Sequence, residues 1–333
     1  MNYIGSKLKL INFIDSTIKS VAGEDLSSKI FCDLFAGTGI VGRHFKTQSR
    51  QLIANDLEYY SYVLNKNYIE NQEVPLQHEL IAELNALPLI SDGLIYSNYC
   101  SGSGSGRNYF SDENGQKIDA IRVKIEEWFH SRQINEEGYF FLLASLLESA
   151  DKVANTASVY GAFLKHLKKT AAQPILLVPA SFFTDGKKHQ VFNCDSNALI
   201  KQIEGDILYL DPPYNSRQYG ANYHILNTIA EYQPFIAHGK TGLRSYQKSK
   251  YCSRQTVLTE FENLIRNAKF QYIFLSYNNE GLMTLDEVRS IMQSHGQYNL
   301  KEIDYQRFKA DKTENRNHKF SHTKEYIHIL IKE

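Results

Sequence analysis

Apolar residues gather in short runs toward both ends of this chain. Two such runs, 30–35 and 51–55, resemble β-strands, and a glycine-bearing turn and a helix-like stretch separate them. Further runs of the same kind stand at 175–178, 207–210, 272–276 and 326–331. Strands that alternate with helices in this way predict an α/β protein with a parallel sheet, and residues 8–20 predict a helix ahead of the first strand.

The middle of the chain has its apolar residues at helical spacing instead. Five of them recur in this way: Ile118, Ile121, Ile125, Trp128 and Phe129. The segment 139–153 is apolar on nearly all sides, which is typical of a helix that packs against several neighbours. The Ser/Gly stretch 101–106 predicts a mobile loop, because it has no apolar surface to bury. We therefore predict one α/β domain, formed by 1–87 and 171–333, with a helical insertion at 88–170.

Composition narrows the class of protein. The 333 residues are 42% hydrophobic, which is enough to fill a sizeable core. The amino terminus has no signal-peptide-like run and no segment approaches about 20 apolar residues, so we expect a cytoplasmic protein without a membrane span. Four widely spaced cysteines exclude a zinc knuckle or a CxxC redox site. Because the net charge is zero, a nucleic-acid-binding surface would have to come from local clustering.

A glycine turn follows the first predicted strand. Gly37, Gly39 and Gly42 have G-x-G-x-x-G spacing, and Asp56 lies 17 residues past Gly39, near the ~20 expected of a ribose-binding acid. This pattern alone favours a nicotinamide or flavin enzyme, or a plain strand-to-helix turn. Asp33 argues otherwise, because a carboxylate would repel a pyrophosphate and attract the ammonium group of a methionine moiety. Asp56 fits either a ribose-hydroxyl acceptor or a helix N-cap.

A second motif, Asp211-Pro212-Pro213-Tyr214, follows the predicted strand 206–210. The prolines end the strand because neither can donate to a ladder, so Asp211 and Tyr214 are held at a strand's carboxyl end, where ligands bind in parallel sheets. The Asp211 carboxylate and the Pro212 carbonyl could accept hydrogen bonds from an exocyclic amine and make its nitrogen a better nucleophile toward a sulfonium methyl group. Tyr214 could stack on a flipped base, worth about 1–3 kcal/mol. The alternative is a rigid turn with a solvent-facing Asp211.

The two motifs together resemble those of the Dam-like D12 class of N6-adenine DNA methyltransferases. Their order agrees with the arrangement called group alpha, in which cofactor motifs precede an insertion and the catalytic tetrapeptide follows it. The resemblance implies a Rossmann-like S-adenosylmethionine-dependent methyltransferase sheet, with the insertion 88–170 as the target-recognition region. Residues 215–260 carry no motif of the class that we can match.

The resemblance also implies roles for individual residues. Residues 3–7 look like the class's amino-terminal cofactor motif, which includes Tyr3 and in which Lys7 would pair with the methionine carboxylate. Phe35 would pack beside the cofactor, with Asp56 in the second motif of the class. Asp195 stands where an acidic contact to the cofactor's adenine is expected. The residues alone do not require these roles, since an amino-terminal lysine is usually solvated and a phenylalanine at a strand end is usually in the core.

One stretch, 240–254, has a cluster of basic residues without an acidic one. Its cations are Lys240, Arg244, Lys248, Lys250 and Arg254. Two tyrosines lie among them, so this stretch is the best candidate for phosphate contact, although a solvated loop fits the charges equally well. His318 and His322 have no carboxylates placed to complete a metal site, and we predict none.

We therefore predict a site-specific DNA adenine N6-methyltransferase that uses S-adenosylmethionine and acts on double-stranded DNA, with a companion restriction endonuclease as a candidate partner. An N4-cytosine or RNA base methyltransferase is the alternative within the same chemistry. From other classes, a nicotinamide-dependent oxidoreductase would explain the glycine turn but not the tetrapeptide, and a non-catalytic DNA-binding subunit would not need the tetrapeptide.

Overall fold

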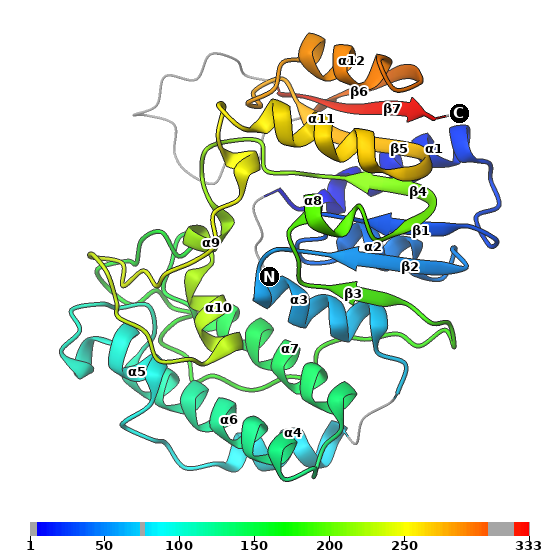
Figure 1. Cartoon of the computed structure of the whole chain (residues 1–333). Helices are drawn as coiled ribbons and strands as arrows, with labels where there is room; N and C mark the ends of the chain where they lie inside the picture. Colours follow the sequence, from blue (N-terminus) through cyan, green and yellow to red (C-terminus); the bar gives the residue numbers. More distant parts are fainter. Residues whose placement is uncertain (1–4, 74–76, 306–322, 333) are drawn as a thin grey trace. The chain divides into compact units, whose positions relative to one another are not determined.

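The computed structural model describes residues 5–73, 77–305 and 323–332, and the chain divides into two compact units (Figure 1). The first, which we call the sheet unit, comprises Ser6–Leu57, Lys187–Gln218 and Lys248–Glu333. The second, which we call the helical unit, comprises Met1–Gly5, Glu58–Gly186 and Tyr219–Gln247.

The sheet unit is built on a seven-stranded sheet in the order β3-β2-β1-β4-β5-β7-β6, counted over the described residues. The strands are β1 (Ile30–Asp33), β2 (Gln51–Asn55), β3 (Gln190–Phe192), β4 (Glu204–Leu210), β5 (Lys269–Asn278), β6 (Gln297–Tyr305) and β7 (Thr323–Ile331). All neighbours pair in parallel except β7, which runs antiparallel to both β5 and β6. The predicted α/β class, with a Rossmann-like sheet, is confirmed.

Helices cover both faces of this sheet, because successive strand side chains point to opposite sides. The helices of the unit are α1 (Ile11–Ala22), α2 (Ile40–Lys46), α8 (Ser196–Leu199), α11 (Val257–Asn267) and α12 (Leu285–Gln293), with the 3-10 turns η1 (Lys7–Leu10) and η4 (Lys250–Cys252). Cys32 of β1 lies in a core with apolar residues of α8, α11 and α12. The preceding residue, Phe31, stacks on Phe45 of α2 with ring centroids 4.4 Å apart.

The helical unit contains the two long helices that the sequence predicts. Its elements are α3 (Tyr59–Asn65), the π-turn η2 (Lys66–Glu70), α4 (Gln77–Ala86), α5 (Leu94–Tyr99), the 3-10 turn η3 (Ser101–Ser103), α6 (Asp112–His130), α7 (Glu136–Val153), α9 (Tyr219–Asn222) and α10 (His224–Glu231). Ser111 caps α6 and Asn135 caps α7 through their side-chain oxygens. The unit is larger than the predicted insertion 88–170, because α3 and α10 pack on α7.

One predicted strand is wrong, and two strands of the sheet were not predicted. The run 175–178 is not a strand: the backbone N–H groups of Ile175, Leu177 and Val178 donate to side chains of the helical unit instead of to another strand. The sequence did not reveal β3 or β6. Both lie at the edges of the sheet, where one side faces no neighbouring strand and polar residues are tolerated, so their apolar patterns are weak.

The Ser/Gly stretch forms a turn with its own hydrogen bonds. It begins with η3, and the hydroxyls of Ser103 and Ser105 donate to the Cys100 carbonyl over 2.7 and 2.9 Å. These bonds give a loop without apolar contacts a defined local geometry, while its predicted mobility stays a prediction.

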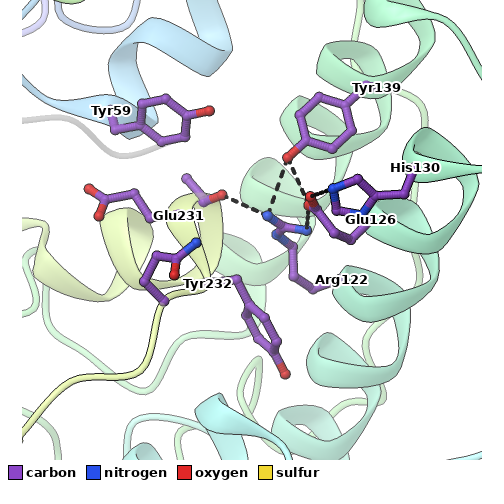
Figure 2. A pocket seen from close by; sticks show the side chains of 9 residues that line it. Tyr59, Arg122, Glu126, His130, Tyr139, Glu231 and Tyr232 are labelled. Carbon is purple, nitrogen blue, oxygen red and sulfur yellow. Dashed lines mark hydrogen bonds and ion pairs between the residues drawn. The ribbon is translucent and has the colours of Figure 1, made fainter.

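A buried arginine joins three helices of the helical unit (Figure 2). Arg122 of α6 is 2% exposed, and it donates to the carbonyls of Ile229 (3.0 Å) and Ala230 (3.1 Å) in the last turn of α10. Those carbonyls have no partner within their own helix. The guanidinium also pairs with Glu126 at 2.6 Å, and the Tyr139 hydroxyl of α7 donates to the same carboxylate. The arginine thus supplies a helix cap and an ion pair in one place.

This network borders a cavity of about 430 Å³ in the helical unit. The remaining lining residues are Tyr59, His130, Glu231, Tyr232 and Gln233. The charges of the wall are already paired, Arg122 with Glu126 and Glu231 with Arg244. The arrangement therefore accounts for the packing of α6, α7 and α10 without a ligand.

Arg122→Met should destabilise the helical unit by about 3 kcal/mol, because it leaves two buried helix-end carbonyls unpaired and the half-buried Glu126 carboxylate without its cation. Urea unfolding followed by the fluorescence of Trp128 would measure this, since that residue is the chain's one tryptophan and is 1% exposed on α6. Glu127→Gln is the matched control, because it breaks a surface pair with Lys124 on the same helix and should change stability by less than about 0.5 kcal/mol. Equal effects of the two substitutions on stability would contradict the role given to Arg122 in holding the three helices together.

Candidate active site

Two neighbouring strands at the centre of the sheet end in an aspartate. Asp33 is the last residue of β1, and Asp211 follows Leu210 at the end of β4. The strands are paired in parallel, with Asp33 opposite Tyr209. From β1 the chain builds the sheet outward in one direction, through β2 and β3. It then returns to the other side of β1 and continues through β4 and β5, so the strand order reverses between β1 and β4. Ligands bind at such a switch point, outside the carboxyl ends of the strands.

The glycine turn after β1 is held by two carboxylates. Gly37 and Gly39 have φ values of 52° and 75°, which a residue with a Cβ rarely adopts. Asp33 Oδ2 accepts the Gly42 N–H at 3.1 Å, and Asp56 Oδ2 accepts the Gly37 N–H at 2.7 Å. The N-cap alternative for Asp56 is wrong, because α3 has Glu58 at its N-cap position. Asp56 instead joins the end of β2 to the glycine turn.

Asp33 is a buried carboxyl group with one oxygen left over. The residue is 1% exposed, and Oδ1 has no hydrogen-bond partner among the described residues. Burial raises the pKa of Asp33 to about 8, with repulsion from the Asp211 and Asp56 carboxylates adding to the shift and the Gly42 N–H opposing it. A cation placed beside Oδ1 would relieve this cost. The predicted partner, an ammonium group, fits this position chemically.

The tetrapeptide forms a compact cluster with an amino-terminal lysine. Lys7 Nζ lies 3.1 Å from Asp211 Oδ1, and the Tyr214 hydroxyl donates to the same oxygen at 2.6 Å. The lysine also donates to the Tyr214 hydroxyl and lies 4.7 Å from the centre of its ring. Tyr277 packs against that ring edge-on, with centroids 5.0 Å apart. These contacts fix both functional side chains of the tetrapeptide.

Asp211 is not the solvent-facing aspartate of the alternative interpretation. Its side chain is 18% exposed, and burial raises its pKa, while Lys7 and the Tyr214 hydroxyl act in the opposite direction. Oδ2 has no hydrogen-bond partner among the described residues, so it stays available as an acceptor. Pro212 behind it is buried and Pro213 half-buried.

The other predicted cofactor residues are distributed around this centre. Phe35 is half-buried and packs edge-on against Tyr251 at 5.1 Å. Asp195 caps α8 by accepting the backbone N–H groups of Asn197 and Ala198, each at 3.0 Å. Tyr3 lies outside the described residues. Lys7 is at the site, but its partner in this structure is Asp211, and no contact here tests its predicted role with a methionine carboxylate.

The sequence interpretation missed Glu325. This residue begins the buried part of β7, is 8% exposed, and lies opposite Asn278 of β5. Burial raises its pKa, the charge of Asp211 raises it further, and the charge of Lys7 lowers it. The one sequence feature that could have pointed to Glu325 is its position directly before the apolar run 326–331. Only the antiparallel pairing of β5 with β7 places it near the tetrapeptide.

The basic stretch is divided between the two units, and three of its five cations are already paired. Arg244 binds Glu231 in the helical unit, while in the sheet unit Lys250 pairs with Glu260 at 3.1 Å and Arg254 donates to Glu287 at 3.0 Å. Lys240 and Lys248 are exposed, and neither forms an ion pair with any residue that the structure describes.

No helix among the described residues is long and apolar enough to cross a membrane. Nor does that part of the chain hold a group of three His, Cys, Asp or Glu side chains suited to a metal ion. His318 and His322 lie outside the described residues.

Comparison with known proteins identifies the family of this chain. Residues 3–291 match the family model of the D12 class N6 adenine-specific DNA methyltransferases. The chain is 64% identical to Type II methyltransferase M.NlaIII of Neisseria lactamica over 333 residues, covering 100% of this chain and 99% of that one. It is 38% identical to M.CviAII of Paramecium bursaria Chlorella virus 1, covering 93% of each chain. It is also 38% identical to M.FokI of Planomicrobium okeanokoites, but spans only 50% of that protein.

The buried Asp33 should make the stability of the ligand-free protein depend on pH. Its pKa of about 8 lies above the ordinary value of 3.8, so its contribution to stability is full below that ordinary value and is lost as pH rises toward 8. Asp33→Asn removes this titration and can keep the bond to Gly42. The variant should therefore exceed the wild type in stability by about 1–3 kcal/mol at pH above 8, and by less at about pH 5.

Urea unfolding at the two pH values measures this difference. Asp286→Asn is the control, because Asp286 belongs to the same unit and is 86% exposed, so it should produce no pH-dependent difference. The assignment is contradicted if Asp33→Asn changes stability equally at both pH values.

Proposed function

The chain belongs to the D12 class of N6 adenine-specific DNA methyltransferases, and on that premise we propose that its reaction takes place at the carboxyl ends of β1 and β4. The observation that carries this proposal is the juxtaposition of a buried Asp33 with the cluster of Asp211, Lys7 and Tyr214. The family match favours DNA adenine over the alternatives of N4-cytosine or an RNA base, and over a nicotinamide-dependent oxidoreductase.

Asp211 would activate the amine. The lone pair of an adenine N6 group is delocalised into the ring, so the nitrogen attacks poorly until its hydrogens are held out of the ring plane. Lys7 and Tyr214 occupy Oδ1 of Asp211, and Oδ2 would accept one N–H while the Pro212 carbonyl accepts the other. The carboxylate would stabilise the positive charge that the nitrogen gains on accepting the methyl group, and the proton that the nitrogen then releases would pass to water.

Tyr214 would hold the flipped base. Its hydroxyl is bound to Asp211 and its edge is packed against Tyr277, so the ring has little freedom left to lose when a base stacks on it. Stacking would contribute about 1–3 kcal/mol, which offsets part of the cost of unstacking the base from the duplex.

The cofactor would lie along the glycine turn. S-adenosylmethionine supplies, when bound, a methyl group on a sulfonium that accepts the attacking electron pair. The free Oδ1 of Asp33 would bind its ammonium group, and the backbone at Gly37 and Gly39 would approach it closely because no Cβ intervenes. Asp56 would accept from ribose hydroxyls. By the resemblance, Phe35, Asp195 and Tyr3 would complete the site.

The partner is double-stranded DNA, with Lys240 and Lys248 as its phosphate contacts, and the helical unit, including 88–170, would read the target sequence. The relatives named Type II methyltransferases favour a restriction endonuclease as a companion. Access to genomic DNA argues for a cytoplasmic location.

Asp211→Asn should lower the single-turnover methylation rate at least about 100-fold, because the neutral amide no longer places a negatively charged acceptor beside the reacting nitrogen. Binding of S-adenosylhomocysteine should change by less than about threefold, since Asp211 does not hold the cofactor in this scheme. Transfer of labelled methyl groups to diverse DNAs, followed by nucleoside analysis for N6-methyladenine, measures the rate. Loss of cofactor binding together with turnover would instead identify Asp211 as a structural residue.

The two unpaired lysines should dominate the salt dependence of DNA binding. Lys248→Ala should reduce the slope of log affinity against log salt concentration by about 1, because one fewer counterion is released. Arg254→Ala is the matched comparison in the same stretch, and it should change the slope little because Glu287 already neutralises that cation. A larger effect of Arg254→Ala than of Lys248→Ala would place the phosphate contact elsewhere.

A further inference from the structure

We propose that Lys7 is a positioning residue that pairs with Asp211 during the reaction, and that it is not the ligand of the cofactor's carboxylate. The inference rests on the proposed function, in which an ionised Asp211 accepts a hydrogen of the adenine amine. It differs from the role that family resemblance gives to an amino-terminal lysine of this motif.

The contacts of Lys7 all lead to the tetrapeptide. Its ammonium group is 3.1 Å from Asp211 Oδ1, donates to the Tyr214 hydroxyl, and faces the Tyr214 ring at 4.7 Å from the centroid. An ammonium group has three donors, and two of them are used here. The residue is 5% exposed, so it does not sample solvent as an amino-terminal lysine ordinarily does.

The backbone holds Lys7 in this position. Lys7 is the first residue of η1, and Leu10 at the end of that turn is 6% exposed. The helix α1 continues directly from η1 and buries Ile14 and Ile18. The lysine is therefore attached to a packed element of the sheet unit, which keeps its side chain directed toward the end of β4.

The surroundings of Asp211 show why a cation is needed. Two other carboxyl groups lie near enough for the charge of Asp211 to raise their pKa values, Asp33 from β1 and Glu325 from β7. The buried phenols of Tyr209 and Tyr214 are the remaining titratable groups that face it. Among the described groups Lys7 is the cation that stabilises its charge. Without that cation, burial would favour protonated Asp211.

Protonation would reverse the function of the carboxyl group. An ionised Asp211 accepts hydrogen bonds at both oxygens, whereas a protonated one donates at one of them and competes for the amine lone pair. Lys7 lowers the pKa of Asp211. When Lys7 is replaced, activity should therefore be lost at a higher pH as the solution is made more acidic.

The first test is the pH profile of the single-turnover rate in Lys7→Met and Lys7→Arg. Lys7→Met should lose at least about tenfold more of the wild-type rate at about pH 6 than at about pH 8.5. A difference of that size requires the pKa that limits activity on the acid side to rise by at least about one unit. Lys7→Arg keeps the charge and should keep the acid limb near its wild-type position. Equal loss in Lys7→Met at both pH values would overturn the proposal.

The second test separates the two roles of Lys7 by ligand. S-adenosylhomocysteine has the amino-acid carboxylate, and 5′-methylthioadenosine lacks it. Lys7→Met should change the dissociation constants of both by less than about threefold. If the substitution weakens the binding of S-adenosylhomocysteine by tenfold or more and leaves the binding of 5′-methylthioadenosine unchanged, Lys7 binds the carboxylate and the proposal is wrong.

A third test does not depend on methylation. A double-mutant cycle of Lys7→Met and Asp211→Asn, read by urea unfolding, should show coupling, whereas Lys7→Met with Asp286→Asn should be additive. Coupling with no adenine methylation would overturn the proposed function and leave the ion pair in place. Additivity in the first cycle would overturn the ion pair even if the protein methylates adenine.

Discussion

The burial of carboxylates at the ends of β1 and β4 is the constraint on which the active site depends. Parallel strands bring Asp33 and Asp211 to the same edge of the sheet, where each loses hydration and repels the other. Lys7 and Tyr214 offset this cost for Asp211, and the Gly42 N–H offsets part of it for Asp33. The cost that remains at Asp33 is a source of affinity for a cationic ligand, at the expense of stability in its absence.

The helical unit also buries a charged group, but there the hydrogen bonds of that group are satisfied. Arg122 is about as deeply buried as Asp33 of the sheet unit, but its hydrogen bonds are satisfied by Glu126 and by the carbonyls that end α10. A satisfied charge fixes the packing of helices, whereas an oxygen without a partner, as at Asp33, is suited to binding. The same physical cost thus supports rigidity in one unit and ligand recognition in the other.

Central elements were predictable from sequence because they are buried on both sides. β1, β4 and β5 have continuous apolar runs, and α6 and α7 have apolar residues at helical spacing. Edge strands β3 and β6 have no such pattern. The run 175–178 has the composition of a strand, yet side chains such as Asn114 take its N–H groups, and local composition does not contain that information.

The sequence by itself determined the two motifs and their order, because glycines with positive φ, a strand-ending Pro-Pro and the flanking aspartates are local requirements of the backbone and the chemistry. The tertiary structure alone decided the partners: Lys7 with Asp211, Glu325 near both, and Arg254 with Glu287. Burial and charge pairing depend on residues far apart in the chain, so the interaction energies that set each group's charge arise only when strands and turns come together.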